Sequence, residues 1–320
     1  MTEWFFNSPA YLELEARRLG GTPEVMYEHG GFCAGVVNRA IPGTRHRDGV
    51  SVYGAPSLAF GGMSAEEGEA AMRAAITGMA AERRLVSLFL RGGVGETFPQ
   101  DSSETCCVEK LADSVVVPLN GTPDDVFNGF RKRHRGEIRR GEKYDFLRCD
   151  DVQGFHEVYT QTMERQHAKN EYFFSLRYFS DLIKIPGSKI YSVRENNQIL
   201  ASAFIVEQFP YLIYHLGGAA SDALNKSPLR VLLAKISLEY VGKEFIGFSL
   251  GSGVGGKKDN LYQFKTGFSK EHKSVFCFKA ILNRAAYNQL CDSSCLDLPL
   301  FDGFFPAYRN PKPSPEEVSR

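Results

Sequence analysis

The sequence predicts a mixed α/β (α+β) protein made of two tandem α/β units. Apolar strands alternate with amphipathic helices along 320 residues, of which 43% are hydrophobic and 12% aromatic, enough for packed cores. The order strand, Gly-Gly, helix, strand, Gly also occurs twice. Two similar units explain this repeat, and chance resemblance within one larger α/β domain is the alternative.

Composition restricts the classes of function. Lys plus Arg equals Asp plus Glu at 38 each, so no overall field draws the protein to nucleic acid or a membrane, and any basic surface must be local. The seven cysteines form no paired CxxC array. We therefore expect reduced thiols and no metal site. No run approaches the ~20 apolar residues of a membrane span, and the N-terminus lacks a leader pattern. These features predict a soluble, cytoplasmic protein.

The first half is predicted to contain short strands, one long helix and one buried strand. Residues 1–60 show strand and turn patterns. Ser64 precedes two glutamates and is an expected N-cap for an alanine-rich helix that continues to about Arg84. The run LVSLFL is typical of a buried strand. The expected strands are 25–27, 31–39, 50–60, 85–90 and 115–119.

The middle of the chain carries its only concentrated cationic segment. Thr122-Pro123 is a helix-start signal, and the helix that we expect to follow reads FNGFRKRHRGEIRRGEK. A solvated helix face is one interpretation of this charge run. Contact with a phosphate backbone is the other, because arginine supplies bidentate donors. The cationic residues are Arg131, Lys132, Arg133, Arg135, Arg139, Arg140 and Lys143.

The second half is predicted to be a strand meander followed by a helix and a final strand and helix. Asn196-Asn197 suits a tight hairpin turn, and Ser227-Pro228 starts a helix with one apolar face. The apolar strand at 245–250 leads into Gly251-Ser252-Gly253 and a short helix carrying Lys265. A strand, glycine turn and helix expose backbone N–H groups, so we expect a concave polar site beside a lysine cation. The other elements expected here are strands at 189–195, 198–207, 211–216 and 274–282, and helices at 151–169 and 176–184.

Three segments between about residues 50 and 282 carry recognisable motifs in a fixed order. The matched residues are Arg135, Ile138, Arg139 and Lys143 in the first, Thr162, Met163, Arg165, Ala168, Tyr172 and Phe174 in the second, and Leu261, Tyr262, Phe264, Lys265 and Phe268 in the third. Together they resemble the Fem family (FemABX) of aminoacyl-tRNA-dependent peptidyltransferases. That family has two tandem acetyltransferase-like (GNAT) domains with mixed central sheets.

The resemblance implies an arrangement of domains and a reaction. It implies an N-terminal domain at 1–120, a basic connecting helix at 121–150, a C-terminal domain at 151–290 and an irregular tail at 291–320. The enzyme would move an amino acid from aminoacyl-tRNA to a primary amine of a peptide-type acceptor. That acceptor is a peptidoglycan precursor or a peptide or nucleoside antibiotic intermediate. Aminoacyl-tRNA would be the co-substrate, no cofactor or metal is implied, and a monomer is expected.

The resemblance also assigns roles. Lys265 would stabilise the tetrahedral oxyanion, with Phe264 beside it. His215 is a candidate general base, and the alternative is a structural role. For the candidate tyrosines, the alternative to lining the site is aromatic packing. The candidate substrate-binding residues are Tyr53, Arg91, Arg165, Tyr172, Tyr214, His215, Ser252 and Tyr262. The candidate tRNA contacts are Arg131, Lys132, Arg133, Arg135, Arg139 and Arg140.

The sequence departs from the family pattern at one point, and two other functions stay open. Family members that bind a nucleotide-linked precursor show Arg-x-Asp-Pro, whereas this chain has Arg91-Gly92-Gly93-Val94, which puts that precursor in doubt. An acyl-CoA-dependent N-acyltransferase of the tandem GNAT type is the first alternative, although neither unit has the Q/R-x-x-G-x-G/A phosphate motif. A non-catalytic RNA-binding protein using residues 131–140 is the second.

Overall fold

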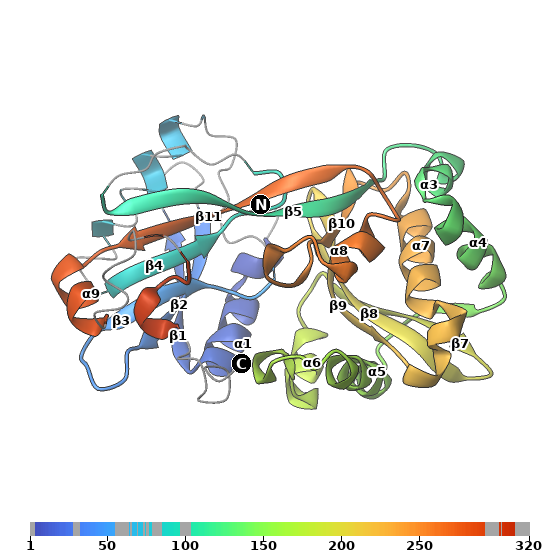
Figure 1. The fold of residues 1–320 in the computed structure, drawn as a ribbon, viewed down its shortest axis with the longest axis horizontal. Coiled ribbons are helices and arrows are strands. Elements are labelled where there is room, and N and C mark those ends of the chain that lie inside the picture. Colours follow the sequence, from blue (N-terminus) through green and yellow to red (C-terminus); the bar gives the residue numbers. More distant parts are fainter. Residues whose placement is uncertain are drawn as a thin grey trace, which may run out of the picture. The chain divides into compact units, whose positions relative to one another are not determined.

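The computed structural model of the chain describes residues 4–27, 33–54, 64–78 with gaps, 85–96, 104–291, 301 and 303–310. The chain forms two compact units. Unit 1 comprises residues 1–14 and 111–275, and unit 2 comprises residues 15–110 and 276–320. Figure 1 shows the elements of both units coloured along the chain.

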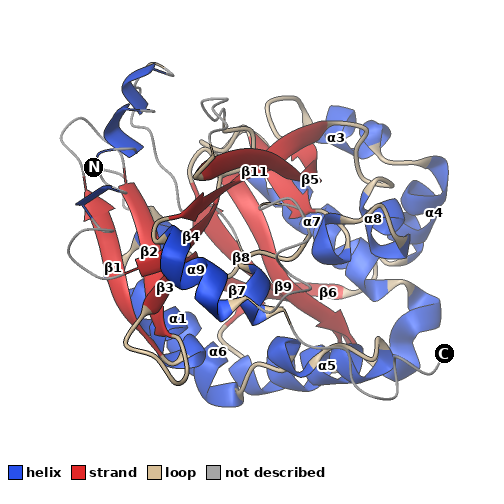
Figure 2. Ribbon diagram, turned by 60° about the vertical axis from the view of Figure 1, so that its left-hand side comes forward, coloured by secondary structure: helices blue, strands red, loops and turns tan. Residues whose placement is uncertain are grey.

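Unit 1 is a mixed sheet with helices on both faces. Its strand order is β5-β10-β9-β8-β7-β6. β9 and β10 are parallel, and the other neighbours are antiparallel. Helices α5 (Val152–Arg165) and α6 (Leu176–Leu182) lie on the face opposite α7 (Pro228–Tyr240) (Figures 1 and 2). The strands are β5 (Cys106–Pro118), β6 (Asp145–Cys149), β7 (Ser188–Glu195), β8 (Gln198–Gln208), β9 (Tyr211–Ala219) and β10 (Gly247–Gly251).

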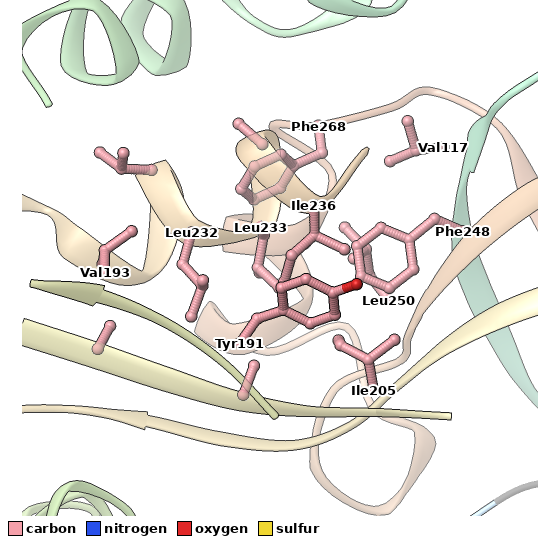
Figure 3. Packing of buried hydrophobic residues seen from close by; sticks show 14 of the residues in the cluster. Val117, Tyr191, Val193, Ile205, Leu232, Leu233, Ile236, Phe248, Leu250 and Phe268 are labelled. Carbon is pink, nitrogen blue, oxygen red and sulfur yellow. The ribbon is translucent and has the colours of Figure 1, made fainter. Parts of the chain in front are cut away.

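The core of unit 1 lies between this sheet and α7. Leu232, Leu233 and Ile236 of α7 are fully buried and face side chains of the sheet, among them Tyr191 and Ile205 (Figure 3). Burying a Leu or Ile side chain stabilises the fold by roughly 1.5–3 kcal/mol, so this face fixes α7 on the sheet. An aromatic cluster between α5, α6 and β8 covers the other face, comprising Phe155, Tyr159, Phe179 and Phe204.

Unit 2 is a second mixed sheet. β1, β2 and β3 pair antiparallel, β3 and β4 pair parallel, and β4 pairs antiparallel with β11. Helix α9 (Arg284–Leu290) contacts β4. Near the C-terminus, Arg309 forms an ion pair with the fully buried carboxylate of Asp48, and the Tyr308 and Ser87 hydroxyls lie 2.7 Å apart. The strands are β1 (Gly21–Tyr27), β2 (Cys33–Ala40), β3 (Arg47–Ser51), β4 (Leu85–Arg91) and β11 (His272–Ile281).

The compact units group the chain differently from the ranges 1–120, 121–150 and 151–290 expected above. Residues 1–14 and 111–150 belong to the same unit as 151–275, whereas 276–290 belong to the other unit. Strand pairing explains this grouping. The C-terminal part of β5 pairs with β10, and Cys277 to Ile281 of β11 pair with β4. Most of the tail expected at 291–320 lies outside the described residues.

Residues 9–19 form helix α1 (Pro9–Leu19), which corrects the strand and turn prediction for the N-terminal segment. The Ser8 hydroxyl accepts a hydrogen bond from the backbone N–H of Tyr11 at 3.3 Å, and Pro9 stands at the first helical position. Both features start helices. Tyr11 and Leu12 are buried, so packing stabilises the short helix that local pattern alone did not reveal.

The basic segment forms two helices instead of the single one predicted. Thr122 caps α3 (Pro123–Gly129) as expected, accepting from the Asp125 N–H at 3.2 Å. The chain is then extended at Phe130 and Arg131, and α4 (Lys132–Arg140) follows. Phe130 is buried against Phe268, with ring centroids 5.6 Å apart. This tertiary contact sets the break between the helices.

The helix expected from Ser64 to about Arg84 is described only in part, and its described residues 66–68, 70–72, 74, 77 and 78 are helical. Its cap is described, and the capping-box bonds between Ser64 and Glu67 confirm it at 2.8 and 3.2 Å. Across the described parts of the chain, we find no helix with the length and apolar character needed to cross a bilayer.

Candidate active site

The candidate site of unit 1 lies where β9 and β10 stop pairing. The parallel ladder joins residues 211–213 to residues 247–249, and β9 continues beyond it through Tyr214 while β10 ends at Gly251. The Lys265 ammonium donates a hydrogen bond to the Ser252 carbonyl at 2.7 Å and lies 5.8 Å from the Tyr214 ring centroid. Three predicted site residues, Lys265, Ser252 and Tyr214, therefore come together.

A capped loop positions Lys265. Asp259 is the N-cap of α8 (Asn260–Lys265) and accepts from the backbone N–H groups of Tyr262 and Val254, each at 2.9 Å. A Cβ atom at Gly253 would lie 2.1 Å from the Lys257 carbonyl oxygen, so only glycine fits the loop there. These constraints fold residues 253–259 tightly and place the end of α8 beside β10.

Burial governs the electrostatics of Lys265. Its side chain is 7% exposed, and desolvation lowers its pKa to about 8, opposed by the nearby Asp259 carboxylate. An ammonium has three N–H donors, and within the described residues Ser252 provides its one hydrogen-bond acceptor. The group therefore has donor capacity for a further oxygen. Gly251, the last residue of β10, has φ of +78°, and a Cβ there would lie 3.4 Å from the Lys265 Nζ.

Phe264 and Tyr262 take separate places around α8. The Phe264 ring lies among helices α4 and α7, with the Arg230 guanidinium 5.4 Å and the Phe268 ring 5.5 Å away. Tyr262 is buried, and its hydroxyl lies 3.2 Å from Nδ1 of His272. Their side-chain partners thus differ from those of the Lys265 ammonium.

His215 occupies a β-bulge. The register of β8 and β9 shifts between Phe204 and Ile205, which leaves His215 without a ladder partner. Its ring packs against Phe6 at 5.6 Å, and its Nε2 lies 3.5 Å from the Tyr11 hydroxyl. Both contacts join β9 to the N-terminal segment, as the structural alternative requires, and a role of His215 as a base stays a prediction.

Arg165 and Tyr172 lie elsewhere in unit 1. The Arg165 guanidinium donates to the Ser221 hydroxyl at 2.8 Å and to the Thr162 hydroxyl at 3.0 Å. The Tyr172 carbonyl accepts from the Tyr159 hydroxyl at 2.7 Å. A polar hollow of about 560 Å³, lined by residues of α5, the β7–β8 hairpin and the segment after β9, includes Ser221.

Tyr53 and Arg91 belong to unit 2. The Tyr53 N–H donates to the buried Glu15 carboxylate at 2.9 Å, and the Arg91 guanidinium lies 5.8 Å from the Phe89 ring centroid. The sequence has no acidic residue directly after Arg91. The structure places Glu96 close to that position, because its carboxylate accepts from the Gly93 N–H at 2.6 Å. Burial raises the pKa of Glu96 to about 8.

The cationic residues of α4 divide into structural and exposed groups. Arg135 donates to the carbonyls of Asn128 and Phe130 at 2.8 and 2.6 Å, closing the turn between α3 and α4. Glu137 pairs with Arg133 and with Arg230 of α7. Arg139 lies over the Phe127 ring at 5.3 Å. Arg133 and Arg139 make these contacts although they are exposed, whereas Arg131, Lys132 and Arg140 are exposed and their side chains make none of the contacts named here.

Metal ligation has no support in this part of the chain. Within the residues that the structure describes, no group of three or more His, Cys, Asp or Glu side chains is placed to hold a metal ion.

The two units define a mixed α/β fold, and comparison with solved structures specifies it. No protein-family model and no curated protein matches the sequence. FemX superposes with a TM-score of 0.67 at 11% identity, over 89% of this chain and 94% of FemX. A conserved protein of unknown function from Bacteroides thetaiotaomicron gives 0.60 at 12% identity, over 87% of this chain and 92% of its own.

A third solved structure has a related fold. The C-terminal domain of a proposed lysylphosphatidylglycerol synthetase from Agrobacterium fabrum gives a TM-score of 0.51 at 14% identity, over 89% of this chain and 95% of that domain. The chain therefore has a FemX-like fold, and the mixed α/β fold class predicted from the sequence is confirmed.

Proposed function

We propose that the protein is an aminoacyltransferase that moves an amino acid from aminoacyl-tRNA to the primary amine of a peptide-type acceptor. One observation carries the proposal. A lysine ammonium, 7% exposed, lies at the carboxyl end of a strand in a FemX-like fold and makes one described hydrogen bond, to Ser252. Burying a cation is costly, and stabilising negative charge that develops during a reaction is a function that justifies this cost.

The reaction needs no redox or metal step. The acceptor amine attacks the ester carbonyl of the donor, so that a C–N bond forms and the carbonyl oxygen becomes an oxyanion. Lys265 donates a hydrogen bond to that oxyanion. The C–O ester bond then breaks, and the proton lost by the amine passes to the departing ribose hydroxyl. A preorganised cation in a desolvated site stabilises such a transition state by about 3 kcal/mol.

The start of α7 supports an ester donor over acyl-CoA. A helix that binds a pyrophosphate presents free backbone N–H groups at its first turn. Here Pro228 occupies the first position and has no N–H, and Ser227 before it is left-handed with φ of 50°. The Arg230 guanidinium also donates to the Ser227 hydroxyl at 3.0 Å. The turn at which a pyrophosphate would bind therefore lacks the N–H of residue 228 and is occupied by the hydrogen bond between Arg230 and Ser227.

The exposed cations of α4 support a nucleic-acid donor. Arg131, Lys132 and Arg140 extend from a protein with no net charge, so the basic surface is local. Phosphate backbones bind such surfaces through Lys and Arg side chains. Cations that the fold does not use are the ones available for this contact.

The test compares donors on the full chain. The purified protein is incubated with a mixture of charged tRNAs or with acetyl-CoA, each with a peptide bearing a free amine, and new amide products are measured by mass spectrometry. We expect transfer from charged tRNA, lowered by about 100-fold or more in Lys265→Met. Lys184→Met, which changes an exposed lysine bound to Asp181, is the matched control and should keep full activity.

Two outcomes would reject the proposal. Transfer from acetyl-CoA alone would identify an acyl-CoA N-acyltransferase. Binding of tRNA without any transfer, unchanged in Lys265→Met, would identify a non-catalytic RNA-binding protein.

A further inference from the structure

The C-terminal end of α8 is bound to helix α4. The Phe264 carbonyl, one residue before Lys265, lies 3.1 Å from Nε2 of His134. The Gly267 carbonyl, two residues after Lys265, accepts from the Arg131 N–H at 2.8 Å. Lys265 is therefore flanked on both sides by carbonyl groups bonded to the first turn of α4.

The contact between these two segments leaves no free space. A Cβ atom at Gly267 would lie 2.1 Å from Cε1 and Nε2 of the His134 ring, so only glycine allows the imidazole to approach. The His134 ring also meets the Phe268 ring edge to face, with centroids 4.8 Å apart and an interplanar angle of 83°. The imidazole is thus enclosed by the turn that follows Lys265.

His134 is held in its neutral form. Since the Phe264 carbonyl is an acceptor, Nε2 carries the proton and donates it. Burial lowers the pKa of His134 to about 4, and the cations of Arg230 on α7 and of Arg131 and Arg133 on α4 act in the same direction. Its Nδ1 is buried without a hydrogen-bond partner among the described residues. An unsatisfied buried acceptor costs about 1–3 kcal/mol, and packing alone does not account for a histidine here.

We propose that His134 is a positioning residue, whose hydrogen bond to the Phe264 carbonyl fixes the last turn of α8 and so holds the Lys265 ammonium at Ser252. Its meaning for catalysis rests on the function proposed above. This hydrogen bond also connects Lys265 to α4, the helix that carries the exposed cations. A ligand bound on α4 would therefore act on the helix turn that carries the ammonium.

The test measures Lys265 itself, with neither donor nor acceptor present. In the full-length protein labelled with 13C,15N-lysine, the resonance missing from Lys265→Met is assigned to Lys265, and its NMR shift is followed against pH. When the turn loosens, water reaches the ammonium, so the midpoint should rise by about 1 pH unit in His134→Ala. His134→Gln, whose amide can donate to the same carbonyl, should restore most of the wild-type midpoint.

Two further variants complete the set. His156→Ala is the matched control, because His156 packs against Phe179 at 5.9 Å in another part of unit 1, and it should leave the midpoint unchanged. Gly267→Ala displaces the imidazole without removing it and should raise the midpoint as His134→Ala does. This variant also keeps the test decisive if His134→Ala fails to fold.

Kinetics separate positioning from binding. With charged tRNA as donor, His134→Ala should lower kcat by about tenfold and leave the KM for the donor unchanged. An unchanged Lys265 midpoint in folded His134→Ala or Gly267→Ala would overturn the positioning role. If the wild-type protein transfers nothing from charged tRNA, the proposed function fails instead, and the titration still reports on His134.

Discussion

The ammonium nitrogen of Lys265 lies 2.7 Å from the carbonyl oxygen of Ser252. This bond joins the end of α8 to the residue that follows β10 and keeps a buried cation at the place where two parallel strands separate. The ammonium can donate further hydrogen bonds, and its pKa is lowered to about 8. These two properties determine how substitutions and pH should affect stability and activity.

Replacing Lys265 with methionine should stabilise the fold at pH 7. The folded-state pKa of Lys265 is about 8, against an ordinary lysine value of 10.5. Below pH 8 both states are protonated, so the buried charge destabilises the folded state in full. Between the two values the unfolded chain binds a proton that the folded chain does not, so wild-type stability rises with pH. Removing the charge should raise the free energy of unfolding by on the order of 2 kcal/mol. About 1 kcal/mol of this is lost because the Ser252 carbonyl no longer accepts a hydrogen bond from residue 265.

Urea denaturation of both proteins at pH 7 and pH 10 measures this effect. The advantage of Lys265→Met should shrink or reverse at the higher pH, whereas Lys184→Met should show no such trend. A difference in stability that stays the same at both pH values would contradict the buried-cation interpretation.

Aminoacyl transfer should decline above pH 8. Only the protonated ammonium can donate to the oxyanion, and its population falls as pH rises through its pKa of about 8. Single-turnover rates at saturating donor, corrected for alkaline ester hydrolysis in enzyme-free blanks, should show a descending limb centred there. Rates that continue to rise up to pH 9.5 would exclude an ammonium role.

Changing Asp259 to asparagine should shift that descending limb to lower pH. The Asp259 carboxylate raises the pKa of Lys265 against the effect of burial, and asparagine removes the charge while remaining a good N-cap. The fold should persist, as monitored by thermal unfolding. A limb at an unchanged pH in a folded variant would show that the two charges are not coupled.

The double variant Lys132→Ala/Arg140→Ala should weaken tRNA binding and reduce its salt dependence. Each lost phosphate contact lowers the log–log salt slope by about 0.7–0.9, so the double change should lower it by about 1–2. Filter binding of charged tRNA between 50 and 200 mM salt, concentrations of the kind at which such slopes are resolved, provides the measurement.

Arg135→Ala is the structural counterpart. Because Arg135 bonds the Asn128 and Phe130 carbonyls, its loss should reduce stability by about 1–3 kcal/mol and leave the salt slope unchanged. If it lowered the slope as the double variant does, the division of α4 into structural and exposed cations would be wrong.

Local signals predicted most of the second half of the chain. The predicted helix start at Ser227-Pro228 is confirmed, because α7 begins at Pro228. Asn196 and Asn197 adopt φ of 53° and 65° in the β7–β8 turn, as the hairpin prediction requires. In both places the residues that determine the structure are adjacent in sequence, so a single sequence reveals them.

Features set by distant contacts were not predicted. At the break before α4, Phe130 packs against Phe268; Gly129, the last residue of α3, is a local helix-end signal, but the tertiary contact is not visible in the sequence. The first half of β5 was missed because residues 106–113 mix apolar with charged side chains, are mostly only partly buried or exposed, and follow no simple alternation.

The candidate site divides in the same way. Lys265 was nominated from its own motif, whereas His134 and Glu96 became visible only once the chain was folded, because their partners and burial are set by tertiary structure. A signal for Asp259 was present in the sequence, since an aspartate directly before a short helix is a typical N-cap.

The crossing of the chain between its two units has a consequence for synthesis on the ribosome. Everything that unit 1 needs has been translated once residue 275 has emerged, but unit 2 still lacks the end of β11, helix α9 and Arg309, the partner of Asp48. The sheet of unit 2 therefore stays incomplete until residues 276–309 have been made. Domains generally fold in N-to-C order during translation, and here the unit whose strands emerge first is the last to be finished.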